Sequence, residues 1–73
     1  MHASVESRLI ARYERRLREA EELLRRQTAL IRALQHSGGR SGIEEAERSL
    51  GKIRRSVDLA RNELARARTP RTA

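Results

Sequence analysis

The sequence has no cysteine, no tryptophan and no phenylalanine, and it has only one tyrosine and one proline. Without cysteine no disulfide can stabilise the fold, and with only two histidines, His2 and His36, we expect no metal site and no cofactor. A chain of 73 residues buries little apolar surface by itself. Oligomerisation is therefore the remaining way to add stability.

Long apolar runs are also absent, so we expect no signal peptide, no membrane span and a cytoplasmic protein. Binding to a membrane surface is disfavoured because the apolar positions include no tryptophan or phenylalanine. Serine, glutamate and arginine are plentiful, but they form no nucleophile, base and orienting group in a recognisable pattern. The sequence therefore predicts a protein that is not an enzyme.

Two uninterrupted series of mostly apolar positions alternate in steps of three and four residues, which is typical of helices in coiled coils. The first series is Ile10, Tyr13, Leu17, Ala20, Leu24, Gln27, Ile31 and Leu34. The second series is Ile43, Ala46, Leu50, Ile53, Val57, Ala60, Leu64 and Ala67. We label these positions a and d of a heptad, with Ile10 and Ile43 as a.

The residues between and around the two series mark helix ends. Gly38 or Gly39 suits the left-handed position after a helix, and Ser41 with Glu44 matches a capping box at the start of the next. Ser4 can cap the first helix, and Thr69 before a proline stops the second.

These signals predict an all-α protein with a single domain over residues 1–73, namely an antiparallel two-helix hairpin. We expect helices over 5–36 and 42–68, a loop over 37–41 and a frayed tail over 69–73. A loop this short reverses the chain, so the helices should pair along their whole length.

The antiparallel register can be checked within the sequence. Pairing a with d from the loop outward places every alanine of the series opposite a larger residue, as in interdigitated layers. Positions next to the two series also carry opposite charges across the hairpin. The expected ion pairs are Glu14–Arg61, Glu21–Arg54 and Arg16–Glu63.

One flank of this predicted hairpin is apolar. The g positions of the first helix carry Leu9, Leu23 and Leu30, and the last two should face Ser56 and Ser49 of the second helix. Leu59 lies at an outer position and carries no inference, because a single exposed leucine is common.

A second copy of the chain could cover these leucines, giving a homodimer in the form of a four-helix bundle. A helix of another protein is the alternative occupant. Gln27, within the apolar series, either fixes register or partner orientation or extends to solvent at an edge. We expect a non-enzymatic protein–protein interaction module whose interface includes Leu9, Leu23, Gln27, Leu30, Ser49 and Ser56.

The chain has a formal net charge of +7, which favours acidic partners, either an acidic protein or a nucleic acid. Residues 1–36 carry +3, residues 37–47 carry −2 and residues 48–73 carry +6, so the open end of the hairpin should be the basic end. Possible nucleic-acid contacts are Arg12, Arg15, Arg16, Arg54, Arg55, Arg61, Arg66 and Arg68. The alternative is a solvated surface of arginine and glutamate.

The segment 19–34, EAEELLRRQTALIRAL, followed by a glycine-containing turn and a second helix, resembles small uncharacterised helical-hairpin proteins of bacteria. The resemblance implies a bacterial helical hairpin and transfers no functional residue. In shape, though not in sequence, the predicted hairpin also resembles the Rop family of plasmid copy-control proteins, which are dimers of helical hairpins that bind RNA. That resemblance implies the alternative function of a basic hairpin that binds the backbone of RNA or DNA.

Overall fold

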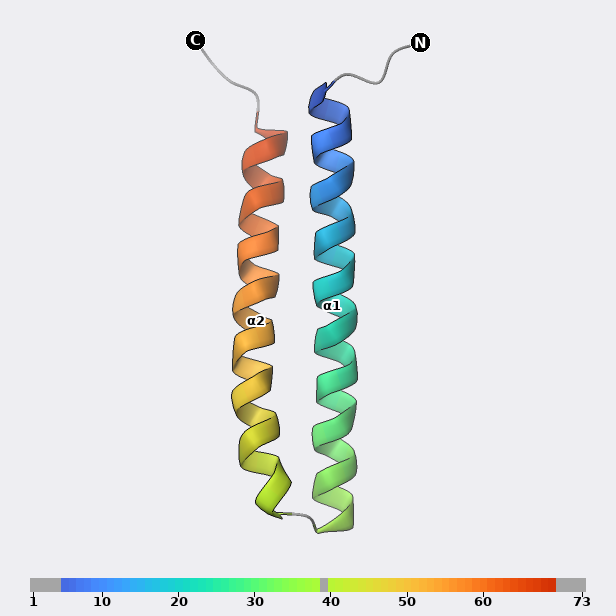
Figure 1. The fold of residues 1–73 in the computed structure, drawn as a ribbon, viewed down its shortest axis with the longest axis vertical. Coiled ribbons are helices and arrows are strands. Elements are labelled where there is room, and N and C mark those ends of the chain that lie inside the picture. Colours follow the sequence, from blue (N-terminus) through green and yellow to red (C-terminus); the bar gives the residue numbers. More distant parts are fainter. Residues whose placement is uncertain (1–4, 39, 70–73) are drawn as a thin grey trace.

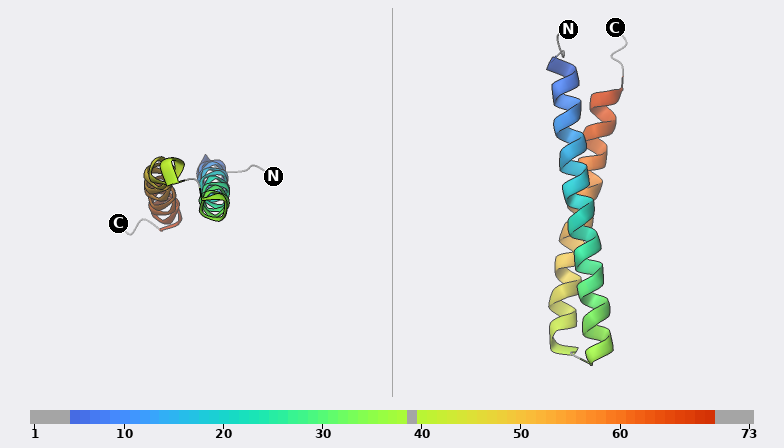
Figure 2. Two further views of the ribbon diagram at one scale, coloured as in Figure 1. Left: turned by 90° about the horizontal axis from the view of Figure 1, so that it is seen from below. Right: turned by 90° about the vertical axis from the view of Figure 1, so that its right-hand side faces the viewer.

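The computed structural model describes residues 5–38 and 40–69, which form two helices packed side by side. Helix α1 spans Val5–Ser37 and helix α2 spans Arg40–Arg68, and they run antiparallel (Figure 1). The hairpin is 55 Å long and 12 Å across its thinnest dimension. The side view in Figure 2 shows the helices crossing at a shallow angle, as expected for helices that pack through a heptad repeat. The predicted all-α hairpin is confirmed.

The two heptad series form the contact between the helices. All 16 of their side chains are buried or half-buried, and the most buried is Val57, at 3% exposure. Only Ile31, Ala46, Val57, Ala60 and Leu64 count as buried. A helix that packs against one neighbour is covered from one side alone, so this seam remains thin.

Contacts across the seam have the predicted register. The side-chain amide of Gln27 donates from Nε2 to the carbonyl oxygen of Ala46, at 2.9 Å, within one helical turn of its expected layer. Near the loop, the side chain of Leu34 lies over Gly42, whose missing Cβ would be 3.6 Å from the Leu34 methyl carbons.

The reversal is tighter than predicted. Helix α1 continues to Ser37, and helix α2 begins at Arg40, two residues before the predicted start. Gly38 has a φ of +75°, which confirms the left-handed position expected of a glycine after a helix. The backbone N–H of Arg40 donates to the carbonyl oxygen of Gly38, at 3.0 Å, so the chain turns within fewer residues than the expected loop.

Helix ends differ from the sequence prediction in detail. Ser41 lies inside the first turn of α2 and not at its N-cap. The second helix ends at Arg68 as expected, and both the backbone N–H and the hydroxyl of Thr69 donate to the carbonyl oxygen of Ala65. The predicted cap at Ser4 and the tail beyond Thr69 lie outside the described residues. Within the described ranges, neither helix has an apolar stretch long enough to cross a bilayer.

Candidate interaction surface

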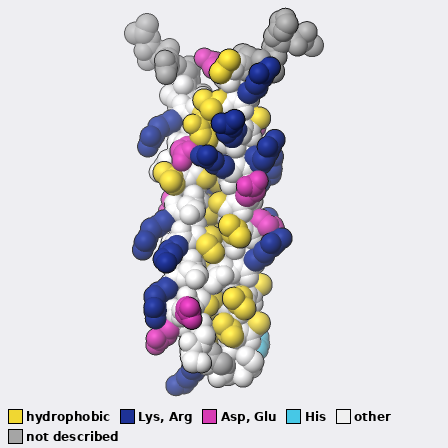
Figure 3. Space-filling view, in the orientation of Figure 1, with side chains coloured by type: hydrophobic (Ala, Val, Ile, Leu, Met, Phe, Trp, Pro, Cys, Tyr) yellow, Lys and Arg dark blue, Asp and Glu magenta, His cyan; other side chains and the backbone are white. Residues whose placement is uncertain are grey.

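The largest exposed hydrophobic side chains other than Val5 lie along one side of the hairpin, which we call the apolar flank. It consists of Leu9, Leu23 and Leu30 of α1 and Leu59 of α2, which are 41%, 52%, 47% and 57% exposed. Figure 3 views this side and shows hydrophobic side chains gathered between and beside the two helices, with basic side chains along both edges and also across the middle near the open end.

Shallow hollows follow the line where the two helices meet on this flank. Leu30 and Ser49 line one of them together with Gln27, as the sequence predicted. Leu9 shares another with Tyr13 and Arg66. The hollow beside Leu23 is lined by residues of α1 alone, so the structure does not bring Leu23 and Ser56 into one hollow. The flank is therefore a shallow apolar surface without an enclosed cavity among the described residues.

Leu59 belongs to this flank, although the sequence analysis gave it no role. Its side chain lines a hollow with Ser56, Ala60 and Glu63. The signal was present in the heptad pattern, because position c of a helix lies next to position g on its surface. Ser56 keeps its hydroxyl within its own helix, where it donates to the carbonyl oxygen of Lys52 at 3.2 Å.

Gln27 lies partly buried between the seam and the apolar flank. Its hydrogen bond to Ala46 crosses from α1 to α2, and the same side chain lines the hollow that contains Leu30. Of the two interpretations of this residue, the hydrogen bond supports a role in fixing register, because a shifted helix would place the amide away from this carbonyl oxygen.

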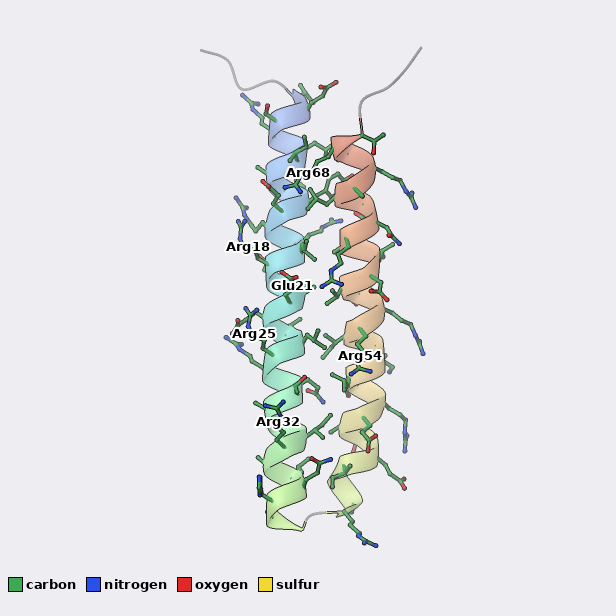
Figure 4. All side chains as sticks on the ribbon, turned by 180° about the vertical axis from the view of Figure 1, so that it is seen from behind. Arg18, Glu21, Arg25, Arg32, Arg54 and Arg68 are labelled. Carbon is green, nitrogen blue, oxygen red and sulfur yellow. The ribbon has the colours of Figure 1, made fainter. Side chains whose placement is uncertain are left out.

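The opposite side of the hairpin, which we call the charged flank, carries ion pairs between the helices. Arg61 Nη2 lies 3.6 Å from Glu21 Oε2, and Arg68 Nη2 donates to Glu14 Oε2 at 2.6 Å. Figure 4 views this side and labels Glu21, Arg54 and Arg68 on it, with Arg18, Arg25 and Arg32 of α1.

These pairs correct the sequence prediction, which paired Glu14 with Arg61 and Glu21 with Arg54. Each glutamate instead binds the arginine seven residues further along α2. Side chains of a helix point toward its N-terminus, so those of antiparallel helices point in opposite directions along the rod. Arg61 extends toward the loop and Glu21 extends toward the open end, and the two therefore converge, whereas Arg61 and Glu14 diverge.

The predicted pair of Arg16 with Glu63 on the apolar flank is confirmed, with Arg16 Nη1 at 3.4 Å from Glu63 Oε2. The directions of the two side chains converge in this case.

One carboxylate of α1 has a perturbed acidity. Hydrogen bonds donated by Arg25 to Glu22 are the main cause of a lowered pKa at Glu22, and the positive charges of Arg25 and Arg26 act in the same direction. These are surface interactions within one helix, and they organise the side of α1 next to Leu23.

The eight arginines proposed as nucleic-acid contacts do not form one surface. Arg16, Arg61 and Arg68 are each paired with a glutamate of the other helix. Among the described residues, the other five have no carboxylate at ion-pair distance, and they are Arg12, Arg15, Arg54, Arg55 and Arg66. Arg54 lies on the charged flank, whereas Arg66 lines a hollow of the apolar flank.

The prediction of a basic open end is wrong for the residues that the structure describes. The open half of the hairpin, residues 5–20 and 57–69, contains eight basic and five acidic residues. The loop half, residues 21–38 and 40–56, contains the same numbers, so each half carries a net charge of +3. The acidic residues near the loop are balanced because residues 48–55 of α2 lie in the same half.

Comparison with protein-family models, curated proteins and solved structures finds no match for this chain. The function of the chain is therefore inferred from the two flanks of the hairpin.

Proposed function

We propose that the chain is a non-enzymatic protein–protein interaction module that self-associates through the apolar flank. The observation that carries this proposal is the contrast between the seam and the flank. The seam leaves only five side chains buried, while four leucines on one flank are 41% to 57% exposed.

Burial of the flank is the largest free-energy gain open to the hairpin. Fully burying a leucine contributes about 1.5–3 kcal/mol. An exposed ion pair contributes about 0.2–1 kcal/mol, so the charged flank offers less. A four-helix bundle made from two hairpins covers apolar side chains of this kind while leaving the charged flanks in water.

The decisive experiment measures molar mass by size-exclusion chromatography with light scattering. The wild-type chain should elute as a dimer, and Leu23→Glu combined with Leu30→Glu should elute as a monomer with its helical circular dichroism preserved. Arg32→Gln combined with Arg54→Gln is the matched control, because it changes the net charge by the same amount on the charged flank. A dimer that persists in the leucine variant would exclude the apolar flank as the interface.

A second candidate function is binding to the phosphate backbone of RNA or DNA. The net charge of +7 and the five arginines without an ion-pair partner among the described residues favour it. Absorbance at 260 nm in the same chromatography run tests it, because a chain with one tyrosine and no tryptophan absorbs weakly itself. Binding that is absent even at about 50 mM salt would exclude this function.

A further inference from the structure

We infer that the occupant of the apolar flank is a second copy of this chain in the opposite orientation, with the two loops at opposite ends of the bundle. The twofold axis would cross the hairpin at the level of Leu23 and Ser56. This inference rests on the proposed self-association and adds the arrangement of the two copies.

Two twofold arrangements can bring the apolar flanks of two hairpins face to face. If the axis crosses the hairpin, α1 packs on the partner's α1 and α2 on the partner's α2, with the loops at opposite ends. If the axis follows the hairpin, α1 packs on the partner's α2, with the loops at the same end. The charges on the flank, at heptad positions c and g, distinguish the two arrangements.

In the arrangement with opposite loops, opposite charges meet along both helices. Glu19 and Arg26 lie four residues before and three residues after Leu23, so each faces the other in the second copy. Glu45 and Arg66 lie eleven residues before and ten residues after Ser56, and they face each other in the same way. The twofold axis generates each pair twice, and no two like charges at these positions face each other.

The same arrangement covers Leu23, Leu30 and Leu59. Leu23 meets its own copy at the axis, and Ser56 meets its own copy on the other helix. Leu30 faces Arg16 and Leu59 faces Lys52, whose aliphatic stems can lie on the leucines while their charges reach solvent.

In the arrangement with the loops together, positions at the same height face each other. Arg12 then faces Arg66 of the second copy, and Arg26 faces Lys52. Each of these like-charge contacts occurs twice. The only opposite pair at these positions is Arg16 with Glu63, and the single hairpin already makes that pair.

The arrangement with opposite loops gives an ion-pair partner to three charged side chains that have none among the described residues of the single hairpin. Glu19, Glu45 and Arg66 have no ion pair within the part of the chain that the structure describes. Charge complementarity therefore selects the second copy with opposite orientation as the occupant.

Single-cysteine cross-linking tests the arrangement, because the chain contains no cysteine of its own. Ser56→Cys should place two sulfurs near the axis, within the distance of about 7 Å between Cα atoms that a disulfide needs. Ser49→Cys lies seven residues away, so its two copies would be about 21 Å apart along the rod. Arg55→Cys, on the outer side of α2, reports random collisions.

We expect covalent dimer on oxidation of Ser56→Cys, and no more covalent dimer from Ser49→Cys than from Arg55→Cys. If Ser56→Cys gives no more covalent dimer than Arg55→Cys in a protein of dimeric mass, the twofold axis does not pass near Ser56, as expected when the loops lie together and Ser56 faces Leu23 of the second copy. That result would overturn the inferred arrangement and leave the proposed self-association intact. A monomeric mass for the wild-type chain would overturn both.

Charge reversal gives an independent readout that needs no cross-link. Arg66→Glu should raise the dimer dissociation constant by at least about 4-fold, since it turns two attractive contacts into two repulsive ones. Adding Glu45→Arg should restore the wild-type value. If the loops lie together, Arg66→Glu would instead face Arg12 and tighten the dimer, which would refute the inference.

Discussion

The two flanks of the hairpin lie on either side of the seam, and their side chains serve different purposes. On the charged flank, Glu14 and Glu21 of α1 reach arginines of α2, so the flank is closed by ion pairs within one molecule. On the apolar flank, α1 carries the exposed leucines Leu9, Leu23 and Leu30, and Leu30 shares a hollow with Ser49 of α2. The hairpin therefore closes one flank with ion pairs of its own, while the leucines of the other flank stay exposed.

The largest difference between the two flanks is expected when Leu59 is substituted. The sequence analysis gave this member of the apolar flank no role. Leu59→Lys should weaken the dimer by about 1.5–3 kcal/mol, because it removes an apolar contact and places a positive charge opposite Lys52 of the second copy. Sedimentation equilibrium of the variant measures this loss. Ala65→Lys introduces the same charge at an exposed alanine of α2, and it should leave the dissociation constant unchanged. Equal effects of the two variants would exclude Leu59 from the interface.

A smaller effect is expected at Gln27, between the seam and the apolar flank. Gln27→Ala removes a hydrogen bond that crosses between the helices, and we expect a loss of about 0.5–1.5 kcal/mol in the free energy of unfolding. Thermal unfolding should show a fall of about 4–8 °C for each kcal/mol lost in a chain of this size. Thr28→Ala is the control, because the Thr28 hydroxyl donates only to Leu24 of its own helix. A Gln27 variant as stable as this control would contradict the role in register.

The ion pairs of the charged flank should have smaller effects still. A double-mutant cycle between Glu21 and Arg61, measured by chemical denaturation, should give a coupling energy of about 0.2–1 kcal/mol that decreases with added salt. The cycle between Glu14 and Arg61, the pair expected from heptad position alone, should give a coupling near zero. The reverse result would show that the side chains do not follow the direction set by their helices.

These cases show which features the sequence determines. The seam was predictable because every one of its 16 positions follows a strict heptad, and none of them is exposed. The left-handed Gly38 was predictable because few other residues adopt that conformation. Both features depend on residue type and on spacing along the chain, which can be read directly from the sequence.

Other features depend on directions in space that residue spacing does not contain. The partners of Glu14 and Glu21 were missed because position labels ignore the tilt of side chains along a helix. The two-residue error at the start of α2 arose because the prediction relied on the Ser41 capping motif, whereas the helix begins at Arg40, directly after the turn at Gly38. The distribution of charge was misjudged because segments were counted along the chain, while folding places residues 48–55 beside the acidic residues of the loop half.

The smallest effect is expected on the pKa of Glu22. Its ion pairs lie within α1, so they contribute neither to the seam nor to the ion pairs between the helices. Its pKa is lowered because Arg25 donates hydrogen bonds to the carboxylate and, like Arg26, adds a positive charge nearby. A carboxyl group with a lowered pKa stabilises the folded chain above its unfolded pKa, and this contribution is lost as the pH falls through the folded pKa. Arg25→Ala should therefore raise the pKa of Glu22, as measured by NMR titration of its side-chain carboxyl carbon, and added salt should raise it in the wild-type chain. If Arg25→Ala leaves the pKa of Glu22 unchanged, Arg26 and not Arg25 would be the arginine that lowers it. The main ion pair of Glu22 would then be the one with Arg26, the residue next to Gln27.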